Sequence, residues 1–229
     1  MQIQVLGAGG AFSPEIGNSS IIFWDKDGGL LVDCGYTVYP IIKKKNLIRR
    51  INRIFITHRH GDHLGSLDTF LYHKRFVLGQ TVKFFGISDI MPYLEAIDPF
   101  FGFDEDGDQY FNLEDDGANV VVIPTKHVEG MVSHALYYKG VLFSGDTSES
   151  LLETPQAYDA KLILHEVSFT DNNVHTYFNE LARAKEEIKR KTWLYHYNVG
   201  EDVSYASKAG NHGFAGFLKK DQILNLAGA

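Results

Sequence analysis

Short apolar runs separated by turn-forming residues recur along almost the whole chain. The runs are rich in Val, Ile, Leu and Phe and are bounded by Gly, Pro, Asp or Asn, a pattern typical of buried β-strands. They predict strands at QIQVLG (2–7), SSIIFWD (19–25), GLLVDC (29–34), RIFIT (53–57), TVKFFG (81–86), ANVVVIP (118–124), HALYYKG (134–140), VLFSGD (141–146), KLILHE (161–166) and TWLYH (192–196).

Two segments follow the helical period instead. From Pro40 to Arg50 the apolar side chains fall on one side and the lysines on the other, and Pro40 suits the first helical position because that position needs no N–H donor. A second helix is expected from about Tyr177 to Lys189. No repeat, low-complexity tract or linker interrupts the alternation of strands and helices, so the pattern predicts a single α/β domain over residues 1–229.

One predicted strand is followed by a concentration of metal-binding side chains. His58, His60, Asp62 and His63 come directly after RIFIT. His58 and His60 are two positions apart, so in an extended segment both imidazoles lie on one side, and Asp62 and His63 follow around the turn. Without partners such buried groups would cost roughly 2–7 kcal/mol each, whereas divalent metal ions bind them. The T-H-x-H-x-D-H pattern therefore predicts two neighbouring metal sites that share one loop.

Composition narrows the class of protein. The 229 residues are 44% hydrophobic and 22% charged, as in ordinary globular proteins. The net charge of −7 argues against binding to long nucleic acids, since that affinity comes mostly from neutralising phosphates. The N-terminal segment lacks a basic region ahead of an apolar stretch, and no apolar run approaches the roughly 18 residues of a membrane span. We therefore expect a cytoplasmic protein that binds no membrane.

With its histidine motif the chain resembles the metallo-β-lactamase-fold hydrolases. The further matching positions are His127 in PTKHVEG, Asp146 in FSGDT and His196 in WLYHYN, each behind an apolar run. The resemblance implies a four-layer αββα sandwich with two divalent metal ions per chain. It assigns His58, His60 and His127 to the first ion, Asp62, His63 and His196 to the second, and Asp146 to both. Nitrogen and oxygen ligands without a thiolate suit zinc, manganese or iron, and zinc is the metal we expect.

Two later segments are similar to the catalytic segments of the phosphodiesterase branch, the tRNA 3′-end endonuclease (tRNase Z) group. In that group a glutamate and a histidine pair beside the metals and protonate the leaving oxygen. The matching residues are Glu166 in LILHEVSF and His175 in VHTY, which with Asp62 form the expected catalytic set. The opening GAGGAFSPEIGNSS also matches this branch. Its glycines would let the loop pass close to the site, where Asn18 and Ser19 are expected to bind substrate.

The chain also departs from the endonucleases. His127 and Asp146 are only 19 positions apart, which leaves no room for the arm that grips tRNA, and Tyr197-Asn198 stands where the endonucleases have a serine-rich segment. With the acidic charge, these departures favour a small phosphodiester as substrate. The chain looks most like compact phosphodiesterases that hydrolyse 3′,5′-cyclic nucleotides, among them phage anti-Pycsar proteins that destroy cyclic CMP and cyclic UMP. The resemblance implies a homodimer and, for a phage protein, the host cytoplasm.

An aromatic segment is the predicted contact for the nucleobase. Residues 91–111 include Phe100, Phe101 and Phe103, which could stack on a base, form a dimer contact or pack into the core. Three other classes of function stay open. A tRNA endonuclease would share Glu166 and His175, a non-phosphate hydrolase would share only the metal ligands, and a non-catalytic scaffold would be expected to lack at least one ligand.

Overall fold

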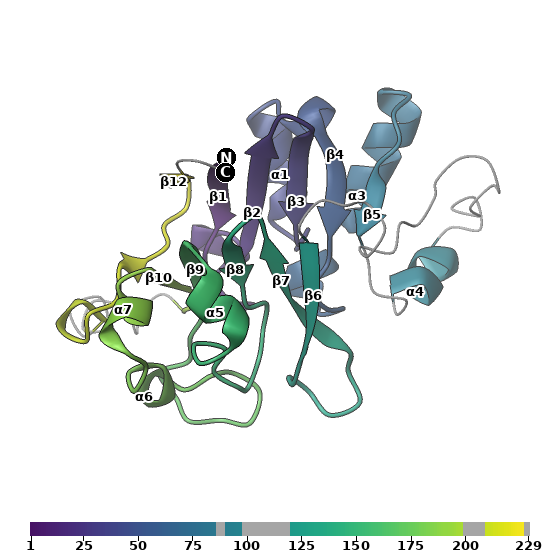
Figure 1. Ribbon diagram of the computed structural model, residues 1–229. Coiled ribbons are helices and arrows are strands. Elements are labelled where there is room, and N and C mark those ends of the chain that lie inside the picture. Colours follow the sequence, from purple (N-terminus) through teal and green to yellow (C-terminus); the bar gives the residue numbers. More distant parts are fainter. Residues whose placement is uncertain (86–89, 98–119, 199–208, 227–229) are drawn as a thin grey trace.

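Two six-stranded sheets face each other in the computed structural model, which describes residues 1–85, 90–97, 120–198 and 209–226 (Figure 1). The first sheet has the order β12-β1-β2-β3-β4-β5 and the second β11-β10-β9-β8-β7-β6. The strands of the first are β1 (Gln2–Gly7), β2 (Ser20–Asp25), β3 (Gly28–Val32), β4 (Ile51–Phe55), β5 (Lys83–Phe85) and β12 (Ile223–Asn225). Those of the second are β6 (Val120–Thr125), β7 (Ser133–Tyr138), β8 (Val141–Phe143), β9 (Leu162–Glu166), β10 (Thr192–Tyr195) and β11 (Gly216–Phe217).

Helices cover the outer face of each sheet, which completes the predicted αββα sandwich and confirms that fold. On the first sheet lie α1 (Val38–Lys44), α2 (Gly61–Leu64), α3 (Leu67–Tyr72) and the π-helical turn η3 (His73–Val77), and α4 (Ile90–Ile97) follows β5. On the second sheet lie α5 (Pro155–Asp159), α6 (Phe178–Leu181) and α7 (Glu186–Lys189). Short 3-10 turns are η1 (Pro14–Ile16) and η2 (Ile48–Arg50). None of the described helices is long and apolar enough to cross a membrane.

Three apolar clusters hold these layers together. Successive side chains of a strand point to opposite faces of its sheet, so every second residue faces the space between the sheets. Phe23 and Phe143 are among the residues that meet there and form the central cluster. Ile54 of β4 packs outward against α1 and α3, and Ile163 of β9 packs outward against α5, α6 and α7. The continuous apolar runs of the sequence follow from this arrangement, since both faces of most strands are buried.

Both helices differ from the prediction. The first begins at Val38, two residues before Pro40, and ends at Lys44, where Asn46 adopts the left-handed φ of 56° that commonly terminates a helix. The second is wrong as one helix, because the chain is extended at Lys185 between α6 and α7. The acidic pair that opens α7, Glu186 and Glu187, is the helix-start signal there.

Candidate metal centre

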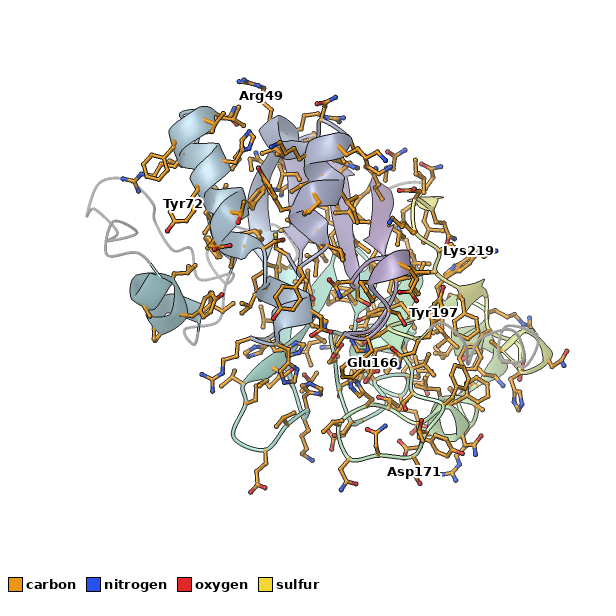
Figure 2. All side chains as sticks on the ribbon, turned by 180° about the vertical axis from the view of Figure 1, so that it is seen from behind. Arg49, Tyr72, Glu166, Asp171, Tyr197 and Lys219 are labelled. Carbon is orange, nitrogen blue, oxygen red and sulfur yellow. The ribbon has the colours of Figure 1, made fainter. Side chains whose placement is uncertain are left out.

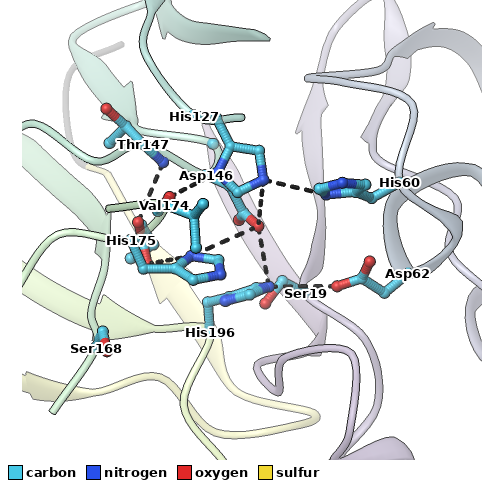
Figure 3. A network of polar contacts seen from close by, with 12 residues as sticks. Ser19, His60, Asp62, His127, Asp146, Thr147, Ser168, Val174, His175 and His196 are labelled. Atoms are coloured by element: carbon cyan, nitrogen blue, oxygen red, sulfur yellow. Dashed lines mark hydrogen bonds and ion pairs between the residues drawn. The ribbon is translucent and has the colours of Figure 1, made fainter. Parts of the chain in front are cut away.

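The polar residues singled out in the sequence converge at one end of the sandwich. Five of the strands that run toward this end, β4, β6, β8, β9 and β10, carry one of these residues at or just after their last position. These residues are His58, His127, Asp146, Glu166 and His196, while His60, Asp62 and His63 lie at the start of α2. Figure 2 shows Glu166 at the end of the sandwich away from Arg49. In Figure 3 the labelled histidines and aspartates point toward one another.

The first group of donor atoms comprises three imidazoles and one carboxylate. His60 Nδ1 lies 3.0 Å from His58 Nε2 and 3.1 Å from His127 Nε2. Asp146 Oδ2 lies 3.8 Å from His58 Nε2 and 3.9 Å from His127 Nε2. Zinc–nitrogen bonds of about 2.0–2.1 Å put the ligands of a tetrahedral ion about 3.3 Å apart, so this spacing suits a small divalent cation.

The second group shares the same carboxylate atom. Asp146 Oδ2 lies 3.3 Å from His63 Nε2 and 3.2 Å from His196 Nε2, and Asp62 Oδ2 lies 3.3 Å from each of the same two nitrogens. These distances also match the edges of a tetrahedral coordination sphere. One carboxylate oxygen therefore joins two sets of donors, an arrangement consistent with a dinuclear centre. The structure brings the seven predicted ligands together in these two groups.

The surroundings of these atoms favour cations. Asp146 Oδ1 and His63 Nε2 are buried and make no hydrogen bond to the described residues. Burial and the neighbouring His63 hold the pKa of His58 well below its usual range, which leaves the neutral imidazole that a metal ion requires. Burial would lower the pKa of His63 too, but Asp146 and Asp33 outweigh it and raise that pKa. A proton and a metal ion would therefore compete for His63.

Asp33 orients His63 and was not assigned a role from the sequence. It follows β3, is fully buried and adopts a left-handed φ of 62°. Its Oδ2 accepts a hydrogen bond from His63 Nδ1 at 2.8 Å, so that Nε2 faces the centre, and its Oδ1 accepts one from the backbone N–H of Thr57 at 2.7 Å. A carboxylate behind a metal-binding histidine fixes the tautomer and strengthens the ligand. In the sequence, the only indication of this role is that Asp33 stands at the end of the predicted strand GLLVDC.

We predict that Asp33→Asn lowers the affinity for zinc about 10- to 100-fold, the usual effect of losing such a partner. The amide keeps the shape of the side chain but removes the negative charge that faces His63. Competition between the protein and a chelator would measure the affinity, with Asp27→Asn, an exposed site at the other end of the sandwich, as the control. Unchanged affinity in a folded Asp33→Asn protein would contradict the orienting role.

Glu166 and His175 form a pair beside the shared carboxylate. Glu166 is fully buried, and its Oε1 accepts hydrogen bonds from the backbone N–H groups of Thr147 at 3.1 Å and Thr176 at 3.0 Å. Its Oε2 lies 3.2 Å from His175 Nδ1, which is also 3.9 Å from Asp146 Oδ2 (Figure 3). The two backbone donors therefore fix the carboxylate so that its free oxygen faces the imidazole.

Charge within this pair favours a protonated histidine in the metal-free protein. Burial raises the pKa of Glu166 and lowers that of His175, but the hydrogen bond and charge of Glu166, together with Asp146, outweigh burial and raise the pKa of His175 to about 9. The His175 side chain is one-quarter exposed to solvent, whereas the Glu166 side chain is fully buried. The arrangement can thus hold a proton at a position that a ligand can reach.

The glycine-rich opening loop passes close to the centre, as predicted. A Cβ added to Gly10 would lie 3.3 Å from the ring of His196, so a side chain at this position would crowd the imidazole. Asn18 and Ser19 are buried and support the chain: Asn18 Oδ1 accepts a hydrogen bond from the backbone N–H of Thr37, and Ser19 Oγ donates one to the carbonyl of Gly9. Their contact with substrate stays a prediction. Phe100, Phe101 and Phe103 lie outside the described residues.

His196 is held in a backbone conformation that non-glycine residues rarely adopt. Its φ is 64°, and its N–H donates to the carbonyl of Ala8 at 2.7 Å. Such conformations cost of order 1–3 kcal/mol and persist where the surroundings determine them. Here the hydrogen bond to the opening loop aims the imidazole at Asp62 and Asp146 rather than along β10.

Comparison with known proteins finds relatives that match nearly the whole chain. A family model described as "Anti-Pycsar protein Apyc1" matches residues 1–96 and 86–224. An anti-Pycsar protein Apyc1 from Paenibacillus sp. (strain J14) is 28% identical, with 99% of both chains covered. Another from Bacillus phage BSP38 is 27% identical, with 93% of this chain and 95% of the relative covered.

A solved structure supports the fold independently of these relatives. The metallo-β-lactamase fold protein YhfI from Bacillus subtilis superposes with a TM-score of 0.76 over 97% of this chain and 98% of its own, at 16% identity. That likeness establishes the fold, and the family match covers both sheets and the histidine motif. The chain has the metallo-β-lactamase fold and belongs to the anti-Pycsar protein Apyc1 family.

Proposed function

We propose that this protein is a dinuclear-metal phosphodiesterase that hydrolyses 3′,5′-cyclic nucleotides to nucleoside monophosphates. Cyclic CMP and cyclic UMP are the expected substrates, with cyclic AMP and cyclic GMP as further ones. The observation that carries the proposal is the Glu166–His175 pair, 3.2 Å apart and next to the carboxylate shared by both groups of donors. By resemblance to the anti-Pycsar family, hydrolysis of such a nucleotide would counter an antiviral signal.

The pair meets the main chemical demand of this reaction. Opening a cyclic phosphodiester expels a sugar alkoxide, a poor leaving group that needs a proton. Because Nδ1 of His175 faces Glu166, the proton on Nε2, at the other side of the ring, is the one available to the leaving oxygen. Glu166 cannot turn away, since two backbone N–H groups hold its other oxygen, and so it keeps the imidazole in this orientation.

The ligand set supplies the second half of the chemistry. Two bound divalent ions would activate water at neutral pH and offset charge on the phosphoryl oxygens. The chain's part is to hold His58, His60 and His127 on one side of Asp146 and Asp62, His63 and His196 on the other. Burial of Asp146 limits competing contact between this carboxylate and water, which strengthens its interaction with cations.

Features of the fold, the charge and the site weigh against the other classes of function. The residues between His127 and Asp146 form the hairpin of β7 and β8, so this part of the chain contains no arm that could grip a tRNA, and the charge of −7 opposes binding of long RNA. A hydrolase of thioesters or lactams would not require the Glu166–His175 pair. A scaffold without activity would not require two complete groups of donors around one carboxylate.

Three further parts of the proposal rest on chemistry or on the family resemblance. Zinc is the expected metal, and manganese and iron suit the same set of imidazoles and carboxylates. Metal analysis of the purified protein would identify the ion. A homodimer and a location in the host cytoplasm are predictions from the family resemblance, and light scattering would test the dimer.

Incubation of the zinc-loaded protein with cyclic CMP, UMP, AMP and GMP, followed by chromatography, tests the proposed function directly. We expect conversion to linear monophosphates, with the relative rates giving the base preference. Precursor tRNA and a thioester serve as competing substrates in parallel assays. No turnover of any cyclic nucleotide, or faster cleavage of the tRNA, would overturn the proposal.

A further inference from the structure

A small pocket opens directly beside the Glu166–His175 pair. It has a volume of about 180 Å³ and reaches His175 and His196 at its inner end. Its walls come from three segments that are distant in sequence: the opening loop at Gly10–Phe12, the segment after β9 at Val167–Thr170, and Tyr197–Asn198 after β10. A phosphodiester bound at the metal centre would thus have this pocket next to it.

Phe12 is the outermost aromatic wall of the pocket. Its side chain is 90% exposed, although Phe side chains are usually buried. The backbone beneath it is fixed, because the N–H of Ser13 donates to the carbonyl of Gly10 and the N–H of Gly10 donates to the carbonyl of Tyr197. The backbone that carries the ring is therefore held beside the pocket on a tight turn, and a ligand needs little rearrangement of this backbone to pack against the ring.

Asn198 supplies a polar wall. Among the described residues its side chain makes one hydrogen bond, in which Oδ1 accepts from Ser13 Oγ at 3.4 Å. The N–H groups of the amide remain for a ligand in the pocket. By contrast, the side chain of Asn172 on another wall forms hydrogen bonds within its own loop, because its Oδ1 accepts from the backbone N–H groups of Val174 and His175. Asn198 is therefore the better candidate to contact a ligand.

We propose that this pocket binds the nucleobase of the substrate, with the base stacked on Phe12 and its polar edge at the amide of Asn198. The inference rests on the proposed function, since the metal centre must hold the phosphodiester. The volume of about 180 Å³ is below the roughly 300–1,000 Å³ of typical small-molecule sites, which suits one base rather than a dinucleotide. Stacking on an aromatic ring tolerates every base, so all four cyclic mononucleotides should bind.

Kinetics of Phe12→Ala with the four cyclic nucleotides test this inference. Loss of a stacking contact should raise KM roughly 5- to 150-fold and change kcat little. Phe12→Trp keeps an aromatic face and should restore a low KM. Asn198→Ala should raise KM to different extents for different bases. Because Phe12 is exposed, these variants should fold, and Phe76→Ala, which removes another exposed Phe from η3, is the matched control.

A substrate without a base separates the possible outcomes. With ribose 3′,5′-cyclic phosphate, wild type and Phe12→Ala should have the same KM. An equal rise of KM for this substrate would overturn base stacking, because Phe12 would then act through the loop or the metals. Unchanged KM for all four nucleotides in Phe12→Ala, with an active wild type, would overturn the inference alone. A wild-type protein that neither hydrolyses nor binds cyclic nucleotides would overturn the proposed function together with it.

Discussion

Hydrolysis of cyclic CMP is expected to fall by on the order of 1,000-fold when Asp146 is replaced by alanine, the upper range for removing one electrostatic group from an active site. Its Oδ2 lies within 3.2–3.9 Å of a nitrogen of four proposed ligand histidines, two in each group of donors. Among the residues that the structure describes, no other belongs to both the group with His58 and the group with Asp62. Its removal would leave two incomplete sets of ligands and imidazoles that repel each other once protonated.

Metal content distinguishes this explanation from simple unfolding. The wild-type protein should hold two ions per chain, and the Asp146→Ala protein should hold fewer while keeping its circular dichroism spectrum. Asp27→Ala is the matched control, since it removes an exposed aspartate at the opposite end of the sandwich. An Asp146→Ala protein with two ions and the wild-type rate would remove Asp146 from the centre and with it the proposed bridging role.

His175→Ala is expected to lower kcat for cyclic CMP about 10²- to 10⁴-fold, the range for loss of a general acid. The reason is specific to the leaving group, because a sugar alkoxide needs the proton that the Glu166–His175 pair holds. With bis(p-nitrophenyl) phosphate the leaving phenolate departs without a proton, and the same variant should lose far less activity. Both ions should remain bound, since the seven proposed ligands are intact.

Two companion variants make this test decisive. Glu166→Gln should reproduce the dependence on the leaving group in weaker form, because the amide can still accept from Thr147 and Thr176 but no longer carries charge. Asp171→Ala, in the same loop but with an exposed side chain, should retain the wild-type rates. If His175→Ala slowed both substrates equally, the histidine would act on metal binding or on the shape of the site, and the role of proton donor would be wrong.

The strands of the sheets and the metal ligands could be predicted from the sequence because both have recognisable local patterns. Strands buried on both faces read as continuous apolar runs, and ten of them were predicted near their final positions. Strands β11 and β12 were missed, since neither has such a run. β12 is defined by its pairing with β1, in which Asn225 lies opposite Gln2 at the other end of the chain.

The sequence by itself determined the chemistry of the centre, and the tertiary structure decided how that chemistry is directed. His58, His60, Asp62 and His63 are close in sequence, so one motif revealed them. Nothing local relates Asp33 to His63, thirty residues later, or shows that Phe12 and Asn198 line one pocket. Both arrangements exist because the sandwich brings the ends of separate strands together. A contact between distant segments depends on how the whole core packs, so it cannot be predicted from a short stretch of residues.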